Sequence, residues 1–205
     1  MKEIKCLSNW KESERMLEEL KGKLIVSCQA QPNEPLHSSF VMGRMALAAK
    51  EGGAAAIRAE SVGDIREIIN VTHLPVIGLI KKDYADSPVY ITPTLYEVES
   101  LLTTNCFMIA TDMTIRKRPI KGDLKKMIRL MRKGQKLILA DISTVDEAIA
   151  AAALGVDAVS TTLSGYTSYS RTLTGPDLEL IRELVSKIDI PVFAEGRINT
   201  PNDIV

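Results

Sequence analysis

The chain has 205 residues, of which 26 are basic and 26 acidic, and 45% of its residues are hydrophobic. These proportions are ordinary for a globular protein and exclude a collagen, a disulfide scaffold and an intrinsically disordered chain. No apolar stretch approaches the roughly 18 residues that a membrane-spanning helix needs. The first residues, Met1 to Cys6, alternate charged and apolar side chains, unlike a secretory signal. We therefore expect a cytoplasmic protein that does not contact a membrane.

The cysteines and histidines do not predict a disulfide framework or a metal site. Three cysteines, Cys6, Cys28 and Cys106, are far apart in the chain and include no CxxC pair. The two histidines, His37 and His73, are also far apart and lack the spacing of a ligand pair. We therefore expect no metal and no cofactor.

One segment of the chain is strongly basic although the net charge is zero. Residues 116–136 contain ten Lys or Arg and a single acid, Asp123. Such a run can bind phosphates, but it lacks the aromatic side chains on which bases stack. We interpret it as the solvated face of a helix, with Leu124, Ile128 and Met131 packed beneath, and expect no nucleic-acid partner.

Residues 1–22 are predicted to form an extension that contains a helix, ahead of one barrel domain over 23–205. Asn9 is a suitable N-cap residue, with Glu12 at the third position of the helix. Trp10, Met16, Leu17 and Leu20 supply its apolar contacts. A helix of this kind can close the bottom of a barrel.

Seven short apolar runs follow in chain order, with helical patterns between them. Continuous apolar runs bounded by Gly, Pro or polar residues are typical of buried parallel strands. The runs are 24–28, 54–57, 76–80, 107–110, 137–140, 158–160 and 192–194. The helical patterns include 39–50, 61–70, a capping box at Thr144 and Glu147, and a start at Thr174 and Pro176. This spacing predicts seven βα units without a domain break.

Two α/β architectures compete, an open doubly wound sheet and a (β/α)₈ barrel. A doubly wound sheet would have a Gly-rich phosphate loop after its first strand, and this chain has none there. Nearly every predicted strand ends in a polar residue, which in a barrel would lie on one common rim. These residues are Gln29, Arg58, Lys81, Asp112, Asp141, Thr161 and Glu195. We therefore favour the barrel.

The end of the sequence leaves the predicted barrel one unit short. After the seventh strand, Thr200 and Pro201 read as the N-cap and first residue of a helix, and the sequence stops at Val205. We therefore expect a (β/α)₈ barrel whose eighth βα unit is missing from this chain.

The predicted rim carries two titratable groups of opposite charge, Lys81 and Glu195. Both follow buried apolar strands, and desolvation favours the neutral form of an amine, which is a competent base. With Arg58 and Asp141 beside them, they suit the removal of a proton next to a carbonyl. Gly196 and the next residue, Arg197, could hold a phosphate after the seventh strand.

Six segments at these strand ends resemble the N-acetylmannosamine-6-phosphate 2-epimerase family, and the resemblance runs from about Lys23 to Val205. They are 25–30, 34–37, 78–84, 90–94, 140–144 and 194–198. The resemblance implies a (β/α)₈ barrel enzyme of bacterial sialic-acid and amino-sugar catabolism. Such an enzyme interconverts N-acetylmannosamine 6-phosphate and N-acetylglucosamine 6-phosphate without metal or nucleotide.

The resemblance also implies roles for individual residues. Lys81 and Glu195 match the catalytic lysine and glutamate of the family. Gln29, Arg58 and Asp141 match residues that hold the sugar and its acetamido group or orient the lysine. The implied partner is a small amino-sugar phosphate, and a homo-oligomer stays open.

Two alternatives remain at this point. The chain could be a truncated, catalytically inactive barrel fragment that binds sugar phosphates, since the family continues past Val205. It could also be another phosphosugar epimerase of the same fold, such as a ribulose-phosphate epimerase. That enzyme would need His and Asp metal ligands at strand ends, for which His37 and His73 are poorly placed.

Overall fold

The computed structural model describes residues 11 and 13–204 and contains a parallel sheet of seven strands in the order β1 to β7. The strands are β1 (Ile25–Cys28), β2 (Ala56–Glu60), β3 (Val76–Leu79), β4 (Met108–Asp112), β5 (Leu137–Asp141), β6 (Ala158–Ser160) and β7 (Val192–Phe193). The order of the strands in the sheet equals their order in the chain, as in a β/α barrel.

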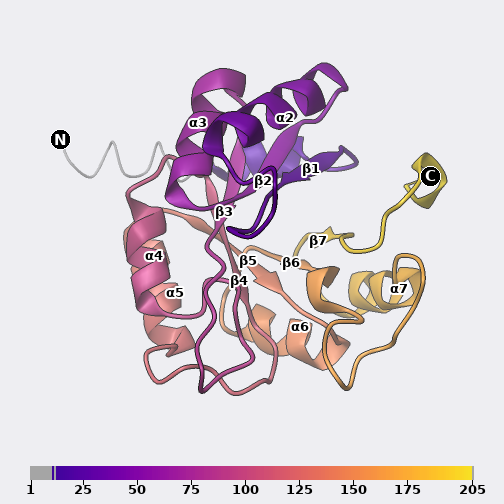
Figure 1. Ribbon diagram of the computed structural model, residues 1–205. Coiled ribbons are helices and arrows are strands. Elements are labelled where there is room, and N and C mark those ends of the chain that lie inside the picture. Colours follow the sequence, from indigo (N-terminus) through magenta and orange to yellow (C-terminus); the bar gives the residue numbers. More distant parts are fainter. Residues whose placement is uncertain (1–10, 12, 205) are drawn as a thin grey trace.

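Helices connect the successive strands and lie around the outside of the sheet (Figure 1). They are α2 (Ser39–Glu51), α3 (Val62–Thr72), α4 (Leu95–Leu102), α5 (Leu124–Lys133), α6 (Val145–Ala153) and α7 (Leu178–Lys187), with 3₁₀ turns η1 (Thr161–Leu163) and η2 (Pro201–Asp203). The expected barrel architecture is confirmed over seven strands. Within the described residues, the outer strands β1 and β7 each pair with one neighbour.

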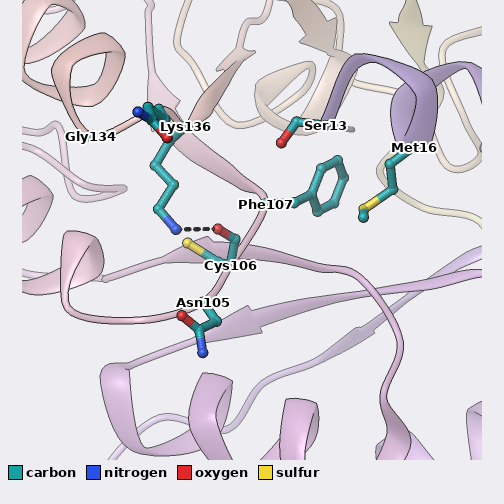
Figure 2. A pocket seen from close by; sticks show the side chains of 8 residues that line it. Ser13, Met16, Asn105, Cys106, Phe107, Gly134 and Lys136 are labelled. Atoms are coloured by element: carbon teal, nitrogen blue, oxygen red, sulfur yellow. Dashed lines mark hydrogen bonds between the residues drawn. The ribbon is translucent and has the colours of Figure 1, made fainter. Parts of the chain in front are cut away.

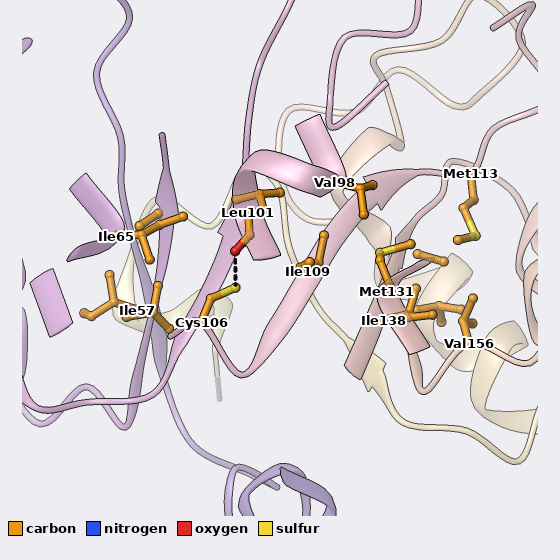
Figure 3. Packing of buried hydrophobic residues seen from close by; sticks show 14 of the residues in the cluster. Ile57, Ile65, Val98, Leu101, Cys106, Ile109, Met113, Met131, Ile138 and Val156 are labelled. Carbon is orange, nitrogen blue, oxygen red and sulfur yellow. Dashed lines mark hydrogen bonds between the residues drawn. The ribbon is translucent and has the colours of Figure 1, made fainter. Parts of the chain in front are cut away.

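The strands divide their apolar side chains between two hydrophobic clusters. Residues two apart, such as Ile77 and Leu79, belong to an interior cluster that also contains side chains from β2, β4, β5 and β6, and Ile25 of β1 and Phe193 of β7 pack against it. The alternate residues Ile57, Ile109 and Ile138 belong to an outer cluster that packs against the helices (Figure 3). Successive side chains of a strand point to opposite faces. Since side chains from all seven strands lie in or against the interior cluster, the sheet is curled around it.

The amino-terminal end of the interior is covered by residues that precede β1. Residues 13–19 are helical, and Leu20 is 6% exposed. Leu20, Met16 and Leu17 pack against the interior cluster. The helix start proposed from Asn9, Trp10 and Glu12 lies outside the described residues.

Several helix starts follow from local sequence, and one differs from expectation. The capping box of α6 is formed, with Thr144 and Glu147 each bonding the other's backbone N–H. The helix expected from Thr174 and Pro176 begins later, because Asp177 is the N-cap residue and its carboxylate accepts from the Leu180 N–H at 3.0 Å. An aspartate side chain can accept a hydrogen bond from a free N–H at a helix start, and here Asp177, not Thr174, does so.

Part of the basic segment forms the exposed face of α5, as expected, through Lys125, Lys126, Arg129 and Lys133. Arg116 and Arg118 precede the helix and instead bond the side chain and the backbone of Asp112. Met127, Ile128 and Met131 on this helix are buried, and Leu124 packs partly against the outer cluster. Among the described residues, every helix is too short or too polar to cross a lipid bilayer.

Candidate active site

The alternation that builds the interior cluster also positions the polar side chains at the carboxyl ends of the strands. In β2, Ala56 faces the interior, so the residues two and four positions on, Arg58 and Glu60, share that face. The same spacing runs from Leu79 to Lys81 and from Leu139 to Asp141. These side chains are therefore carried to the end of the barrel where active sites of this fold occur.

Arg58 and Asp141 form a buried ion pair across the barrel interior. The guanidinium NH2 of Arg58 lies 2.7 Å from Asp141 Oδ2, and its NH1 lies 3.1 Å from Oδ1. The two side chains are 4% and 0% exposed. Burial raises the pKa of Asp141 to about 6, and the positive charge of Arg58 opposes this rise. Arg58 is part of β2 rather than the residue after it, because the strand continues to Glu60.

Glu195 joins the same group from the segment after β7. Its Oε2 lies 3.3 Å from the NH1 of Arg58 and accepts hydrogen bonds from Ser160 at 3.0 Å and Thr162 at 2.9 Å. The backbone of Glu195 is held by the Thr161 hydroxyl, which accepts from its N–H at 3.0 Å and donates to its carbonyl at 2.8 Å. Turn η1 thus fixes where this carboxylate points.

Lys81, two residues after the end of β3, is paired with Glu60. Its Nζ is 3.9 Å from Glu60 Oε2, which also accepts a hydrogen bond from Gln31 at 2.6 Å. Burial raises the pKa of Glu60, and the nearby Lys81 opposes this rise. In the described residues no hydrogen bond or ion pair joins Lys81 to Glu195. Each of the two proposed catalytic groups therefore contacts a different residue on the interior face of β2: Lys81 contacts Glu60, and Glu195 contacts Arg58.

Gln29 follows β1 and presents an unsatisfied carbonyl oxygen. Its Nε2 donates to the Ser27 hydroxyl at 2.6 Å, while its Oε1 is buried without a partner among the described residues. Gln29 lines a cavity of about 300 Å³ together with Leu36 and Met42. A buried amide oxygen without a donor is costly, so this atom is available to accept a hydrogen bond from a ligand N–H or O–H.

Gly196 and Arg197 directly follow Glu195. Gly196 matters for its backbone conformation and Arg197 for its side-chain contacts. Gly196 has φ of +100°, a conformation that side-chain-bearing residues rarely adopt. The Arg197 guanidinium donates to the carbonyls of Ser164 and Gly175 at 2.5 and 2.8 Å and lies over the Tyr166 ring. This side chain holds the loop after η1 against the segment that carries Glu195.

Three polar residues of this site were not identified from the sequence: Glu60, Ser160 and Thr162. Glu60 lies four positions after the interior residue Ala56 of β2, Ser160 two positions after the interior residue Ala158 of β6, and Thr162 of η1 four positions after Ala158. Following the two-residue period through and beyond the apolar runs would have found them. Asp112, expected at a strand end, is the last residue of β4 and forms an ion pair with Arg116.

A second cavity lies at the opposite, amino-terminal end of the strands, and none of the proposed site residues lines it. It has a volume of about 230 Å³ and lies between the residues before β4, the residues before β5 and the helical residues 13–19 (Figure 2). Lys136 at its wall donates to the backbone carbonyls of Thr104 and Cys106 at 3.0 and 2.6 Å. Residues at this end of a barrel generally serve stability, and these contacts fit that role. Over residues 11 and 13–204, no three His, Cys, Asp or Glu side chains are grouped to hold a metal ion.

Comparison with known proteins agrees on one family. Residues 42–204 match the family model described as "Putative N-acetylmannosamine-6-phosphate epimerase". A protein of that name from Clostridioides difficile (strain 630) is 60% identical over 189 residues, which cover 92% of this chain and 85% of the relative. A relative from Clostridium perfringens (strain 13 / Type A) with the same name is 58% identical over the same share of this chain.

Solved structures give the same result. The structure of the N-acetylmannosamine-6-phosphate 2-epimerase from Clostridium perfringens matches with a TM-score of 0.90 and 58% identity, covering 92% of this chain and 82% of that one. Thiamine phosphate pyrophosphorylase from Pyrococcus furiosus, at 19% identity and a TM-score of 0.57, shares the fold alone. The extent and identity of these matches show that the chain belongs to the N-acetylmannosamine-6-phosphate epimerase family.

Proposed function

We propose that the protein is an isomerase that interconverts N-acetylmannosamine 6-phosphate and N-acetylglucosamine 6-phosphate by inverting C2 of the sugar. The observation that carries this proposal is the arrangement around β2. Lys81 pairs with Glu60 and Glu195 pairs with Arg58, and both partners lie on the interior face of β2. A site with an amine and a carboxylate around one strand end suits proton removal and return at a carbon atom.

The chemistry that we propose begins when the sugar opens to its aldehyde form, which makes the C2 proton acidic. Lys81 or Glu195 removes this proton, and the electrons of the C–H bond move toward the C1 oxygen. Arg58 stabilises the negative charge that develops there. Return of a proton to the opposite face of C2 inverts the stereocentre.

The remaining residues of the site are proposed to bind the substrate. The unpaired Oε1 of Gln29 would accept from the acetamido N–H. Asp141 would hold Arg58 in place through the two bonds described above. The backbone of Gly196 and Arg197 would receive the phosphate, with the Arg197 side chain retaining the loop that covers it.

A deuterium-exchange assay tests the proposed function. The purified protein is incubated with N-acetylmannosamine 6-phosphate in D₂O, and NMR follows the C2 proton and the appearance of the epimer. We expect both sugars to acquire deuterium at C2. Replacing Lys81 by Met should slow exchange by about 100- to 10,000-fold, the usual contribution of a general acid or base.

Lys82→Met is the matched control, because the neighbouring Lys82 is exposed and should tolerate the change. Normal exchange in Lys81→Met would remove that residue from the mechanism, and no exchange in the unmodified protein would refute the proposed function. The role in sialic-acid and amino-sugar catabolism and the cytoplasmic location are part of the same proposal. Growth on these sugars and cell fractionation test them.

A further inference from the structure

Four side-chain oxygens form a closely spaced group beside the proposed reaction centre. Glu195 Oε2 and Asp141 Oδ1 lie 2.9 Å on either side of the Thr162 hydroxyl. The Ser160 hydroxyl lies 2.8 Å from that of Thr162 and 3.0 Å from Glu195 Oε2. Asp141 and Glu195, here called the carboxylate pair, are thus connected through two hydroxyl groups.

The local fold explains why these residues meet. Ser160 is the last residue of β6 and lies in register with Asp141, the last residue of β5. Turn η1 follows directly and carries Thr162. The Thr161 side chain between them bonds the backbone of Glu195. One short turn therefore places both hydroxyls between the carboxylates and fixes the position of Glu195.

The number of protons available is too small for this arrangement when both carboxylates are ionised. Four oxygen–oxygen contacts in the group, at 2.8 to 3.0 Å, are at hydrogen-bond distance. Each needs one proton between its two oxygens, and the hydroxyls of Ser160 and Thr162 supply one each. Two contacts would then have lone pairs facing each other. One further proton on the carboxylate pair fills a third contact and completes a chain from Glu195 through Ser160 and Thr162 to Asp141.

The charges around the group favour the same extra proton. Arg58 is the cation in contact with both carboxylates, at 2.7 Å from Asp141 and 3.3 Å from Glu195. With both carboxylates ionised the group carries a net negative charge in a largely buried place, and one proton makes it neutral. Tyr90, which also faces the group, has its pKa raised by burial. Its phenol therefore adds no negative charge near neutral pH.

We propose that Asp141 and Glu195 share one proton through the hydroxyls of Ser160 and Thr162, and that this chain delivers a proton to Glu195 during turnover. The proposal rests on the proposed function only for its second part. While Glu195 is ionised the shared proton is on Asp141, which passes it to Thr162; Thr162 passes its own to Ser160, and Ser160 passes its own to Glu195, which can then give a proton to the substrate. One proton moves in total, and each O–H bond that breaks is replaced by another.

The direction of the Asp141 pKa shift agrees with this assignment. Burial raises this pKa to about 6, and both Arg58 and the Thr162 hydrogen bond oppose the rise while the charge of Glu195 adds to it. A carboxyl group that holds its proton near pH 6 can exchange it with a neighbour under physiological conditions.

The first test needs no substrate and no activity. Carbon-13 NMR of the side-chain carboxyl groups is recorded on the unliganded protein between pH 4 and 8, with assignments from Asp141→Asn and Glu195→Gln. We expect the Asp141 signal to change near pH 6, and one proton, shared by the pair and assigned to neither residue alone, to be taken up between pH 8 and 4. Two ionised carboxylates down to pH 4 would overturn the proposal.

The second test asks whether the chain acts in turnover. Thr162→Val keeps the shape of the side chain and removes the hydroxyl, and Thr162→Ser restores a hydroxyl. We expect Thr162→Val to lower kcat at least about tenfold and to change its pH profile, with little change in KM, and Thr162→Ser to recover most of the rate. An unchanged kcat and pH profile in Thr162→Val would refute the relay. A protein that shows the shared titration but does not epimerise the sugar would refute the proposed function and leave the shared proton in place.

Discussion

Arg58 of β2 and Asp141 of β5 are joined by two hydrogen bonds of 2.7 and 3.1 Å, although β3 and β4 lie between their strands in the sheet. The contact spans the barrel interior, and its residues are 83 positions apart in the chain. It ties the first half of the barrel to the second just above the interior hydrophobic cluster.

The first prediction concerns the stability contributed by this pair. Arg58→Met should lower the free energy of unfolding by about 3–5 kcal/mol, because it leaves Asp141 buried without its cation. The double variant Arg58→Met, Asp141→Leu should recover much of that loss, since no buried charge is left behind. Urea denaturation measures both. A single variant as stable as the unmodified protein would contradict the buried geometry.

The second prediction concerns the pH dependence of stability. The pKa of Asp141 is about 6 in the folded protein and about 3.9 in an unfolded chain. The folded state therefore binds the proton more tightly, and the contribution of Asp141 is fully present below about pH 4. It is lost as the pH rises through about 6, by up to about 1.4 kcal/mol per pH unit.

Urea denaturation of the unmodified protein and of Asp141→Asn from pH 4 to 7 isolates this contribution. The asparagine does not titrate, so the difference between the two proteins should change across this range and level off above it. A difference that is constant with pH would show that Asp141 titrates alike in the folded and unfolded states.

How far the sequence predicted this fold is clearest from β2. The apolar run 54–57 indicated the strand, but the strand covers Ala56–Glu60. The apolar criterion ends the strand too early, because Arg58 and Glu60 are buried polar residues whose partners lie far away in the chain. Asp141 and Lys81, which make that burial tolerable, cannot be assigned to them from local sequence.

The positions of the main site residues were predictable from two signals, the ends of the strands and the family motifs. Lys81, Glu195, Arg58 and Asp141 all lie at the carboxyl ends of strands, as expected. Which of these charged side chains pair with one another was not predictable from the sequence. In the structure Lys81 contacts Glu60 and not Glu195. Pairing depends on the curl of the sheet, and that curl is a property of all seven strands together.

The third prediction concerns Glu60 as the partner of Lys81. Glu60→Gln keeps a side chain that can accept from Gln31 but removes the charge 3.9 Å from the Lys81 Nζ. We expect kcat/KM to fall roughly five- to tenfold, as for the loss of about 1 kcal/mol of charge pairing. Glu60→Asp retains the charge at a longer distance and should be intermediate. Steady-state kinetics measures kcat/KM of the unmodified protein and of both variants. Equal values for all three would mean that Glu60 does not position Lys81.

The fourth prediction concerns Glu147, whose carboxylate ties three loops together. It is 1% exposed and accepts hydrogen bonds from the backbone of Ser143, Thr144 and Ile115 and from the Tyr169 hydroxyl. Glu147→Ala should lower the free energy of unfolding by at least about 3 kcal/mol, because several buried donors lose their acceptor.

Tyr169→Phe is the matched comparison for Glu147→Ala, since it removes one of these bonds and should cost about 1 kcal/mol. Thermal and urea denaturation of both variants give the comparison. Similar losses in the two variants would mean that the backbone donors find other acceptors when the carboxylate is removed.

The alternation of side chains along each strand also determines where the chain can tolerate a change in length. Removing Leu137, the first residue of β5, would turn Asp141 toward the helices and bring Ile138 into the barrel interior, because a shift of one position exchanges the two faces of a strand. A residue removed from the exposed segment 171–174 shifts no strand position relative to its neighbours. Natural and engineered length variants of this protein should therefore have their insertions and deletions between the strands, and none within them.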